Sequence, residues 1–210
     1  MKKVNIFPTP IYEFHNSDID NDDIVEKLSK ETLREHTALS SLEDLHTKEG
    51  YEDLFLWFDE CLDKIHKEMR YDCDKITITS SWCNKQYAQS GMYHSPHKHT
   101  MSMLSGVYYC THGAPTCFQD PVTQRTEAQI EVLQHDFTPF EYIEAVPGKL
   151  IIFPSWMYHS TTRSVEEVDR WSIAFNTFPD GKINYNIARD SVCLLYTSPS
   201  PRDVEESRMP

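Results

Sequence analysis

The sequence lacks a long hydrophobic run. No apolar stretch in its 210 residues approaches the length of a membrane span, and the N-terminal MKKVNIFPTP carries two lysines but no apolar segment like that of a secretion signal. The six cysteines include no Cys-x-x-Cys pair. We therefore expect a cytoplasmic protein with reduced cysteines and no membrane contact.

Clusters of positive charge are also missing. The net charge is −13, and the densest basic stretch, Lys64 to Arg70, is interrupted by Glu68. Because such a chain repels phosphate groups, nucleic acids are not expected among its partners.

The composition is that of an ordinary globular domain. Hydrophobic residues make up 39% of the chain and aromatic residues 12%, which argues against wholesale disorder. The length suits one domain with elaborations, large enough to bury a core without disulfides, and no internal repeat is visible.

The first third of the chain predicts an arm and two helices. Residues 4–14 are apolar but contain two prolines, which favours an edge strand or extended arm. Residues 17–35 open with Ser and Asp capping residues and are expected to be helical, and 36–50 follows as a polar linker. Residues 51–70 predict an amphipathic helix. Its apolar face consists of Leu54, Phe58, Cys61, Leu62, Ile65 and Met69.

The pattern changes to short strands after residue 74. Apolar and polar residues alternate, and Pro, Gly and Asp separate the segments, which is typical of an antiparallel sandwich or barrel. We therefore expect a mainly β chain, with an N-terminal arm and helices (1–74) packed on a β core (75–187). The expected strands are 75–87, 101–110, 141–146, 149–154 and 170–178.

The last residues do not continue this pattern. The segment CLLYTSPSPRDVEESRMP resembles a translated sequencing-adapter read-through. We expect residues 188–210 to be a disordered tail or a non-native scar, and we assign them no function.

His97 and His99 are candidate metal ligands. In a strand, residues two apart point to the same side, so both imidazoles would face one point, although a histidine-rich surface turn has the same spacing. His159, which follows the strand GKLIIFP, is a candidate third ligand or an ordinary turn residue. His94 precedes Pro96, so strand alternation does not place it, and we expect a surface or supporting position.

The stretch RWSIAFN places polar and apolar residues on opposite faces of a strand. Arg170 and Ser172 share the polar face, which would point into a cavity, with Ala174 and Asn176. An inward guanidinium needs an anion, and an arginine beside a hydroxyl suits a carboxylate. The alternative is a structural ion pair with one of the nearby acids Glu166, Glu167 and Asp169.

Further polar residues are candidates for the same cavity. Asn84 and Tyr87 lie on the preceding expected strand and would reach a small ligand, or face solvent. If a strand runs on from His97, Tyr109 shares the face of the histidines and lines the cavity. The same face would carry Met101, Met103, Ser105 and Val107.

Taken in order, these motifs resemble one superfamily. The phrases PHKHTMSMLSGVYY, GKLIIFPSWMYHS and DRWSIAFN are similar to those of the iron(II)- and 2-oxoglutarate-dependent oxygenases, above all an uncharacterised bacterial and phage branch. The resemblance spans about residues 4 to 180. It implies a double-stranded β-helix, a jelly roll of the cupin type, and an enzyme that hydroxylates its substrate while converting 2-oxoglutarate to succinate and carbon dioxide.

The resemblance also implies the cofactors and their ligands. His97 and His159 match the two histidines that hold Fe(II), and Arg170 with Ser172 matches the clamp for the distal carboxylate of 2-oxoglutarate. Asn84 and Tyr87 resemble further cosubstrate contacts, and no catalytic residue is expected beyond the metal site.

One position departs from the superfamily pattern. His99 stands where Asp or Glu is usual, so either His99 ligates the metal or Asp120, in CFQDP, supplies a carboxylate from another strand. His99 has the expected spacing and is the favoured ligand. A neutral triad leaves the metal site more positive, which is compatible with an anionic keto acid.

Two other readings stay open. The first is a cupin-type metal-dependent dioxygenase or isomerase that does not use 2-oxoglutarate, and the second is a non-catalytic metal-binding or structural jelly roll. The expected partner is a small-molecule or protein substrate that the sequence does not identify, and a homodimer remains an option.

Overall fold

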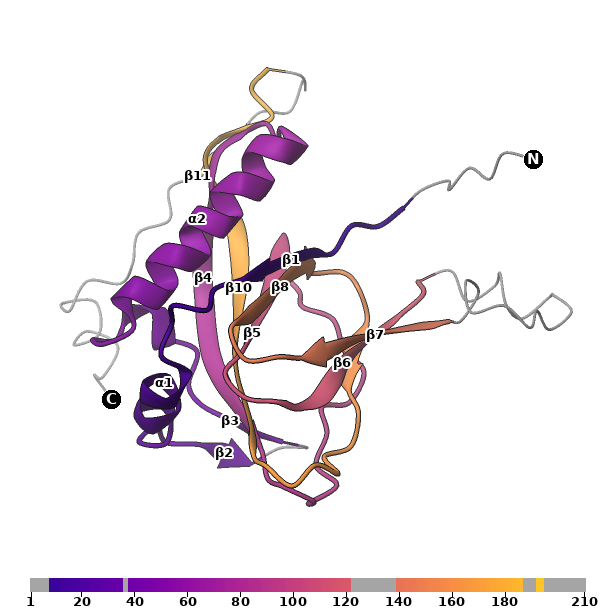
Figure 1. Ribbon diagram of the computed structural model, residues 1–210. Helices are drawn as coiled ribbons and strands as arrows, with labels where there is room; N and C mark the ends of the chain where they lie inside the picture. The colour runs from indigo at the N-terminus through magenta and orange to yellow at the C-terminus, as the bar shows by residue number, and fades with distance from the viewer. Residues whose placement is uncertain (1–7, 36–37, 122–138, 187–191, 195–210) are drawn as a thin grey trace, which may run out of the picture.

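The computed structural model describes residues 8–35, 38–121, 139–186 and 192–194 (Figure 1). The helices are α1 (Asn21–Leu28), the short 3-10 turn η1 (Leu45–Thr47) and α2 (Glu52–Met69). The strands are β1 (Tyr12–His15), β2 (Arg34–Glu35), β3 (Leu39–Ser40), β4 (Cys73–Gln86), β5 (Leu104–Tyr109), β6 (Gly113–Gln119), β7 (Phe140–Ala145), β8 (Lys149–Pro154), β9 (His159–Thr161), β10 (Arg170–Ile183) and β11 (Val192–Leu194).

The described strands form two antiparallel sheets. The large sheet has the order β1-β8-β5-β10-β4-β3-β2, with β11 also paired to β10, and the small sheet has the order β7-β6-β9. β10 is the central strand of the large sheet, since it pairs with β4 on one side and with β5 on the other. Strands far apart in the sequence therefore lie side by side, as expected for the predicted mainly β fold.

The segment before β5 extends the small sheet without being a regular strand. Residues 91–103 run along 155–164, and the backbones of His97 and His159 exchange two hydrogen bonds of 2.9 Å each. Further along, the backbone N–H of His99 donates to the carbonyl of Ser155 at 3.0 Å. This irregular pairing holds His97 and His99 next to His159, which is the first residue of β9.

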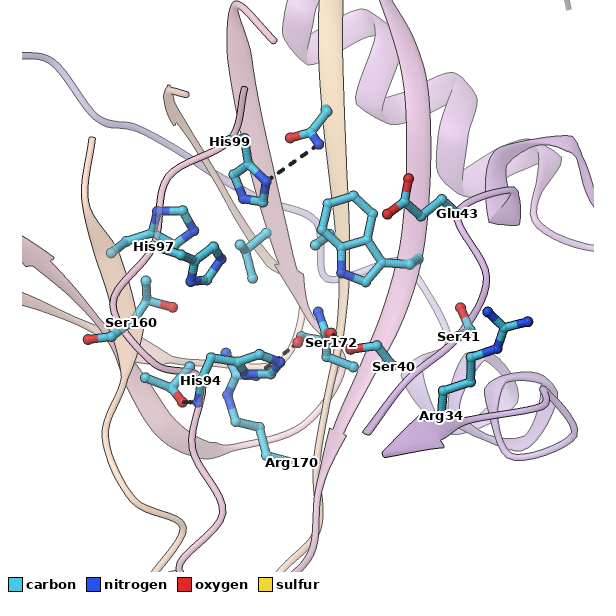
Figure 2. A pocket seen from close by; sticks show the side chains of 18 of the residues that line it. Arg34, Ser40, Ser41, Glu43, His94, His97, His99, Ser160, Arg170 and Ser172 are labelled. Atoms are coloured by element: carbon cyan, nitrogen blue, oxygen red, sulfur yellow. Dashed lines mark hydrogen bonds between the residues drawn. The ribbon is translucent and has the colours of Figure 1, made fainter. Parts of the chain in front are cut away.

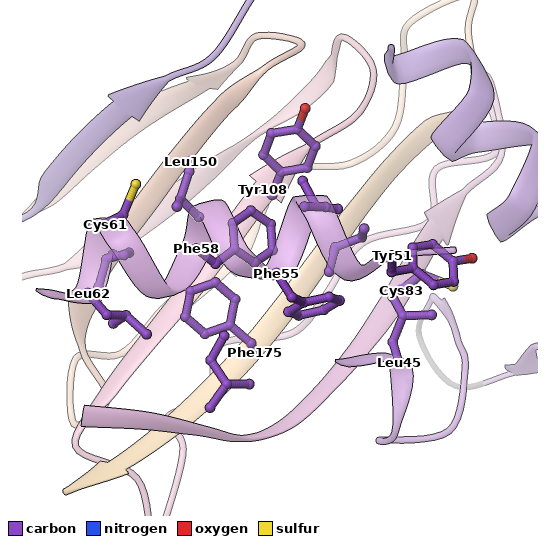
Figure 3. Close-up of a cluster of buried hydrophobic side chains, with 14 of the residues drawn as sticks. Leu45, Tyr51, Phe55, Phe58, Cys61, Leu62, Cys83, Tyr108, Leu150 and Phe175 are labelled. Carbon is purple, nitrogen blue, oxygen red and sulfur yellow. The ribbon is translucent and has the colours of Figure 1, made fainter. Parts of the chain in front are cut away.

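Helix α2 covers the outer face of the large sheet. Its apolar residues recur with helical spacing, and Leu54, Phe58 and Leu62 are buried, as predicted. The Phe58 ring lies 5.5 Å from the ring of Tyr108 and 5.2 Å from that of Phe175, so the helix is fixed on β5 and β10 (Figure 3). α1 is held by its own cap, since the Asp20 side chain accepts hydrogen bonds from two backbone N–H groups.

The two faces of β10 divide as the alternation in RWSIAFN predicts. Trp171, Ile173 and Phe175 lie in the hydrophobic core under α2. The other face carries Arg170, Ser172, Ala174 and Asn176, and all four line a cavity between the two sheets.

Three expectations about local structure are corrected. The predicted linker 36–50 holds β3 and η1, and the N-terminal part adds β1, β2 and β3 to the large sheet. No strand runs from His97 to Tyr109, because β5 begins only at Leu104 and the backbone turns at Met101, which has φ 51° and is 84% exposed. In the expected tail, Val192–Leu194 pairs with β10, while 187–191 and 195–210 lie outside the described residues.

Within the described residues, no helix has both the length and the apolar character that a membrane span requires.

Candidate metal centre and carboxylate site

A cavity of about 620 Å³ opens between the two sheets. Figure 2 shows the residues that line it: His97 and His99 lie on one side, His94 and Arg170 lie at the lower end of the view, and the segment that carries Arg34 and Glu43 forms the opposite wall. The volume suits a small molecule, and the lining is rich in polar side chains.

Three histidines converge in this cavity. One ligand nitrogen from each of His97, His99 and His159 lies within 4.8 Å of the other two, and no other such group occurs among the described residues. The ring centroids are 4.4 Å apart for His97 and His159, 5.2 Å for His97 and His99, and 5.1 Å for His99 and His159. Because the backbones of His97 and His159 are paired, the fold itself holds these two side chains together.

Backbone carbonyls select the tautomer of two of these histidines. Nδ1 of His97 lies 2.7 Å from the carbonyl oxygen of Ser95, and Nδ1 of His159 lies 3.0 Å from that of Met157. A carbonyl only accepts, so each Nδ1 carries the proton and donates it. Each Nε2 is thereby left with a lone pair for a metal ion, which is the usual arrangement around a ligating histidine.

Two of the histidines are also in the charge state that a metal needs. Burial lowers the pKa of His159 to about 3, and the neighbouring His97 contributes to the shift. Burial likewise lowers the pKa of His99 to about 4, again with a contribution from His97. Both imidazoles are therefore neutral at pH 7, and a set of three imidazole nitrogens fits a divalent first-row transition metal such as Fe(II).

Arg170 lies at the inner end of the same cavity. It is 2% exposed; its Nε donates to the carbonyl of Ala114 at 2.9 Å, and Nη1 donates to Oγ of Ser172 at 2.9 Å. The alternative ion pair is not formed, since Asp169 pairs with Lys85 at 2.9 Å, and no carboxylate in the described part of the chain pairs with Arg170. Burial lowers the pKa of the guanidinium from its ordinary value, the direction expected for a buried cation without a counterion.

Sequence and structure comparisons show what this site is similar to. A family model described as "Putative 2OG-Fe(II) oxygenase" matches residues 80–176, from β4 to β10. This part of the chain is therefore similar to the 2OG-Fe(II) oxygenases. The matched stretch contains the three histidines and Arg170. No match was found among the curated proteins compared with the chain.

Solved structures of oxygenases have the same fold. HygX from Streptomyces hygroscopicus, with nickel and 2-oxoglutarate bound, is 12% identical and has a TM-score of 0.58 over 90% of this chain and 92% of its own. The non-heme alpha-ketoglutarate-dependent epimerase SnoN from nogalamycin biosynthesis is 7% identical, with a TM-score of 0.63 over 90% and 91%. A prolyl-4-hydroxylase from Pseudomonas putida is 13% identical, with a TM-score of 0.57 over 82% and 94%. The double-stranded β-helix predicted for this chain is thereby confirmed.

The remaining predicted cosubstrate residues are Asn84, Tyr109 and Tyr87, and only Asn84 lines the cavity. Asn84 lines the cavity, where its Oδ1 accepts a hydrogen bond from Ser40. Tyr109 is fully buried beneath Arg170, whose guanidinium carbon lies 5.4 Å from the tyrosine ring centroid, and its hydroxyl donates to Thr116 on the cavity wall. Tyr109 does not line the cavity, so the prediction that it contacts the cosubstrate is wrong, and its ring packs against Arg170 instead.

Tyr87 does not reach the cavity, and the prediction for it is wrong. The register pairs Arg170 with Gln86 and Ser172 with Asn84, so in this part of β4 the even-numbered residues share the cavity side and Tyr87 follows on the other side. Tyr87 is 48% exposed and lies under the ammonium group of Lys85 on the opposite side. The alternative ligand Asp120 follows the end of β6 and belongs to neither the histidine group nor the cavity lining.

His94 is a cavity residue that the sequence did not place. Its side chain lies beside Arg170 in Figure 2, and its Nε2 is buried without a hydrogen-bond partner. Burial and the positive charge of Arg170 lower the pKa of His94 to about 3, so the ring is neutral. His94 is placed by the pairing of residues 91–103 with 155–164, in which the Thr161 hydroxyl accepts a hydrogen bond from the His94 backbone N–H at 2.8 Å. A sequence pattern does not show a contact between such distant segments.

The second wall of the cavity was also missed. Arg34, Ser40, Ser41, Leu42 and Glu43 line it, and they come from β2, β3 and the turn after β3. This stretch had been assigned to the end of a helix and a linker, because a two-residue strand is too short to leave an alternating pattern.

Proposed function

We propose that the chain is an Fe(II)- and 2-oxoglutarate-dependent oxygenase that hydroxylates its substrate. The observation that carries this proposal is the pairing of a three-histidine centre with a buried, uncompensated arginine in one cavity. His97, His99 and His159 would hold the iron through nitrogen atoms. Arg170 would hold the distal carboxylate of 2-oxoglutarate.

Arg170 and its neighbours suit a carboxylate. The hydrogen bonds from Nε and Nη1 fix the guanidinium plane, and its charge has no counterion in the described residues. A carboxylate bound beside it would supply that counterion and would accept a hydrogen bond from Nε2 of His94, whose buried nitrogen otherwise has no partner. One ligand would therefore satisfy both groups.

The residues around the three histidines orient the ligand nitrogens and exclude water from the buried side of the site. When bound, iron with 2-oxoglutarate supplies the oxidising power for hydroxylation by O₂, with succinate and carbon dioxide as coproducts. The protein holds Nε2 of His97 and His159 ready through the two backbone carbonyls. The rings of Phe153 and Phe118 lie 4.8 and 6.0 Å from the His159 ring and keep water away from its buried side.

The test is an anaerobic titration of the full chain with Fe(II) and then with 2-oxoglutarate. We expect a weak visible charge-transfer band that requires both additions, and a thermal shift with 2-oxoglutarate that requires the metal. His159→Ala should abolish both signals, because it removes a ligand. If the wild-type protein gives neither band nor shift while it remains folded, the oxygenase proposal fails.

A second function is favoured by one observation, the absence of a carboxylate from the ligand group. A cupin-type dioxygenase or isomerase that does not use 2-oxoglutarate would work with three neutral histidines. It has no need of a buried arginine beside the metal. Metal binding without any response to 2-oxoglutarate would support this alternative, or a non-catalytic metal-binding jelly roll.

We also propose a cellular compartment and a class of substrate for the enzyme. The described structure has all six cysteines free, which suits a reducing compartment such as the cytoplasm, where Fe(II) also persists. With a net charge of −13, a small molecule or a protein is a better substrate candidate than a nucleic acid. A homodimer stays a prediction.

A further inference from the structure

Of the three histidines, only His99 has no backbone carbonyl to fix its tautomer among the described residues. Its Nδ1 lies 3.5 Å from Nδ2 of Asn176, on the cavity face of β10. If that amide nitrogen donated to Nδ1, the neutral ring would carry its proton on Nε2. His99 would then have no lone pair at the nitrogen left for a metal.

A chain of buried serine hydroxyls leads away from this amide. Oδ1 of Asn176 lies 2.8 Å from Oγ of Ser105, which lies 2.8 Å from Oγ of Ser155. Ser155 lies 2.7 Å from Oγ of Ser102. Ser102 is the end of the chain, with the carbonyl oxygens of Leu104 at 3.1 Å and Thr177 at 3.2 Å.

Counting hydroxyl hydrogens gives this chain a direction. The two carbonyls only accept, and each also has another donor: the backbone N–H of Met103 lies 2.8 Å from the Thr177 carbonyl, and the Thr177 hydroxyl lies 2.9 Å from that of Leu104. If Ser102 donated to Ser155, its oxygen would face both carbonyl oxygens with no hydrogen between them. We therefore assign the single hydrogen of Ser102 to the carbonyls and let Ser102 accept from Ser155. Ser155 therefore accepts from Ser105, and the hydrogen of Ser105 is used as well. Ser105 can then only accept from Asn176, which requires the amide nitrogen, and not the oxygen, on its side.

The count therefore reverses the amide relative to the orientation described above. The two ends of an amide have nearly the same shape, so a half-turn exchanges oxygen and nitrogen without moving the neighbours. The carbonyl oxygen of Asn176 then faces Nδ1 of His99. All three histidines would donate from Nδ1 to an oxygen and keep Nε2 for the metal.

We propose that Asn176 is a positioning residue for His99, and that Ser102, Ser155 and Ser105 set the direction of its amide. The inference rests on the proposed metal centre and adds the group that prepares its third ligand. Ser155 acts on His99 twice, because its carbonyl also accepts the His99 backbone N–H at 3.0 Å. The backbone and the ring of His99 are thus held through the same serine.

The test uses the full chain with ¹⁵N-labelled histidine and Zn(II), a diamagnetic ion that binds imidazole. Long-range ¹H–¹⁵N spectra report which ring nitrogen carries the proton, and calorimetry reports Zn(II) affinity. We expect His99 to carry its proton on Nδ1 in the metal-free wild type. In Asn176→Ala this preference should disappear and Zn(II) affinity should fall by about 10- to 100-fold.

Two further variants separate positioning from damage to the fold. Asn176→Asp keeps an acceptor beside His99 and should restore both the Nδ1 proton and the affinity. Asn21→Ala removes an amide outside the cavity, which contacts the Tyr108 hydroxyl and not His99, so it should leave both readouts unchanged.

Several results would overturn the inference. They are a proton on Nε2 in the metal-free wild type, an Asn176→Ala variant that matches the wild type, and equal losses in Asn21→Ala. Failure of the wild type to bind Zn(II) is a different outcome, which would overturn the metal centre itself. The tautomer of metal-free His99 would still report on the Asn176 contact.

Discussion

The two faces of β10 are both buried, yet they are stabilised in different ways. Trp171, Ile173 and Phe175 pack against α2 and neighbouring strands, and their burial is complete without any other molecule. On the opposite face, Arg170 is equally inaccessible but keeps a charge without a counterion in the described residues. His94, which faces it, keeps an unpaired ring nitrogen.

This difference separates structure from function within a single strand. Burying an apolar side chain stabilises the fold, whereas burying an unpaired polar group costs free energy. A strand that does both at alternate positions has one face for stability and one face prepared for a ligand. Substitutions on the two faces should therefore change different measurements.

The largest expected effect is on the apolar face. Phe58→Ala removes the ring that contacts both Tyr108 and Phe175, and we expect unfolding free energy to fall by about 3–5 kcal/mol. Urea denaturation measures the loss. The affinity of the remaining folded protein for 2-oxoglutarate should be unchanged, and a loss below about 1 kcal/mol would contradict this account of the core.

On the cavity face, Arg170→Met should show the opposite behaviour. We expect 2-oxoglutarate binding to the Ni(II)-loaded protein to weaken by about 2–5 kcal/mol, because the bound carboxylate loses its partner. Stability of the ligand-free protein should not fall, since the change removes a buried charge that has no counterion. Calorimetry and urea denaturation check the two halves, and equal loss of Ni(II) and 2-oxoglutarate binding would indicate a structural role.

Gly113→Ala should lower both stability and 2-oxoglutarate affinity to a moderate extent. A Cβ at this position would lie 2.7 Å from Cβ of Arg170 and 3.0 Å from its Cγ, so the arginine or the β6 backbone must shift. We expect a cost of about 1–3 kcal/mol in stability, together with weaker 2-oxoglutarate binding. Thermal unfolding and calorimetry measure the two effects, and wild-type behaviour in both would show that the contact is easily relieved.

The smallest effect is expected at Tyr87, on the outer side of β4. Tyr87→Ala should change 2-oxoglutarate affinity and unfolding free energy by no more than about 0.5 kcal/mol, since the ring is half exposed and points away from the cavity. A clear loss of cosubstrate affinity in this variant would restore the original prediction for Tyr87.

Local patterns explain which parts of the molecule could be predicted. The alternation in 170–176, the helical spacing in α2 and the two-residue spacing of His97 and His99 depend only on neighbours in sequence, and the structure contains all three. The direction in which Tyr87 points depends on the register between β4 and β10, because register fixes which residues of a strand face inward.

Contacts between distant segments explain what could not be predicted. His94 reaches the cavity through an irregular pairing with 155–164, past Pro96, and no short-range period encodes that path. The wall formed by Arg34 and Glu43 depends on two-residue strands that join the sheet edge. Both features are set by tertiary structure, and propensity alone does not reveal them.

The backbone bridge between His97 and His159 has a consequence for folding. Its two partners are far apart in the chain, so the histidines meet only after residues 91–103 have paired with 155–164, and the unfolded chain has no comparable site. A metal that binds only the assembled state stabilises it in proportion to the logarithm of metal concentration. Iron supply would thus regulate how much of this protein persists in the cell as well as how much of it is active.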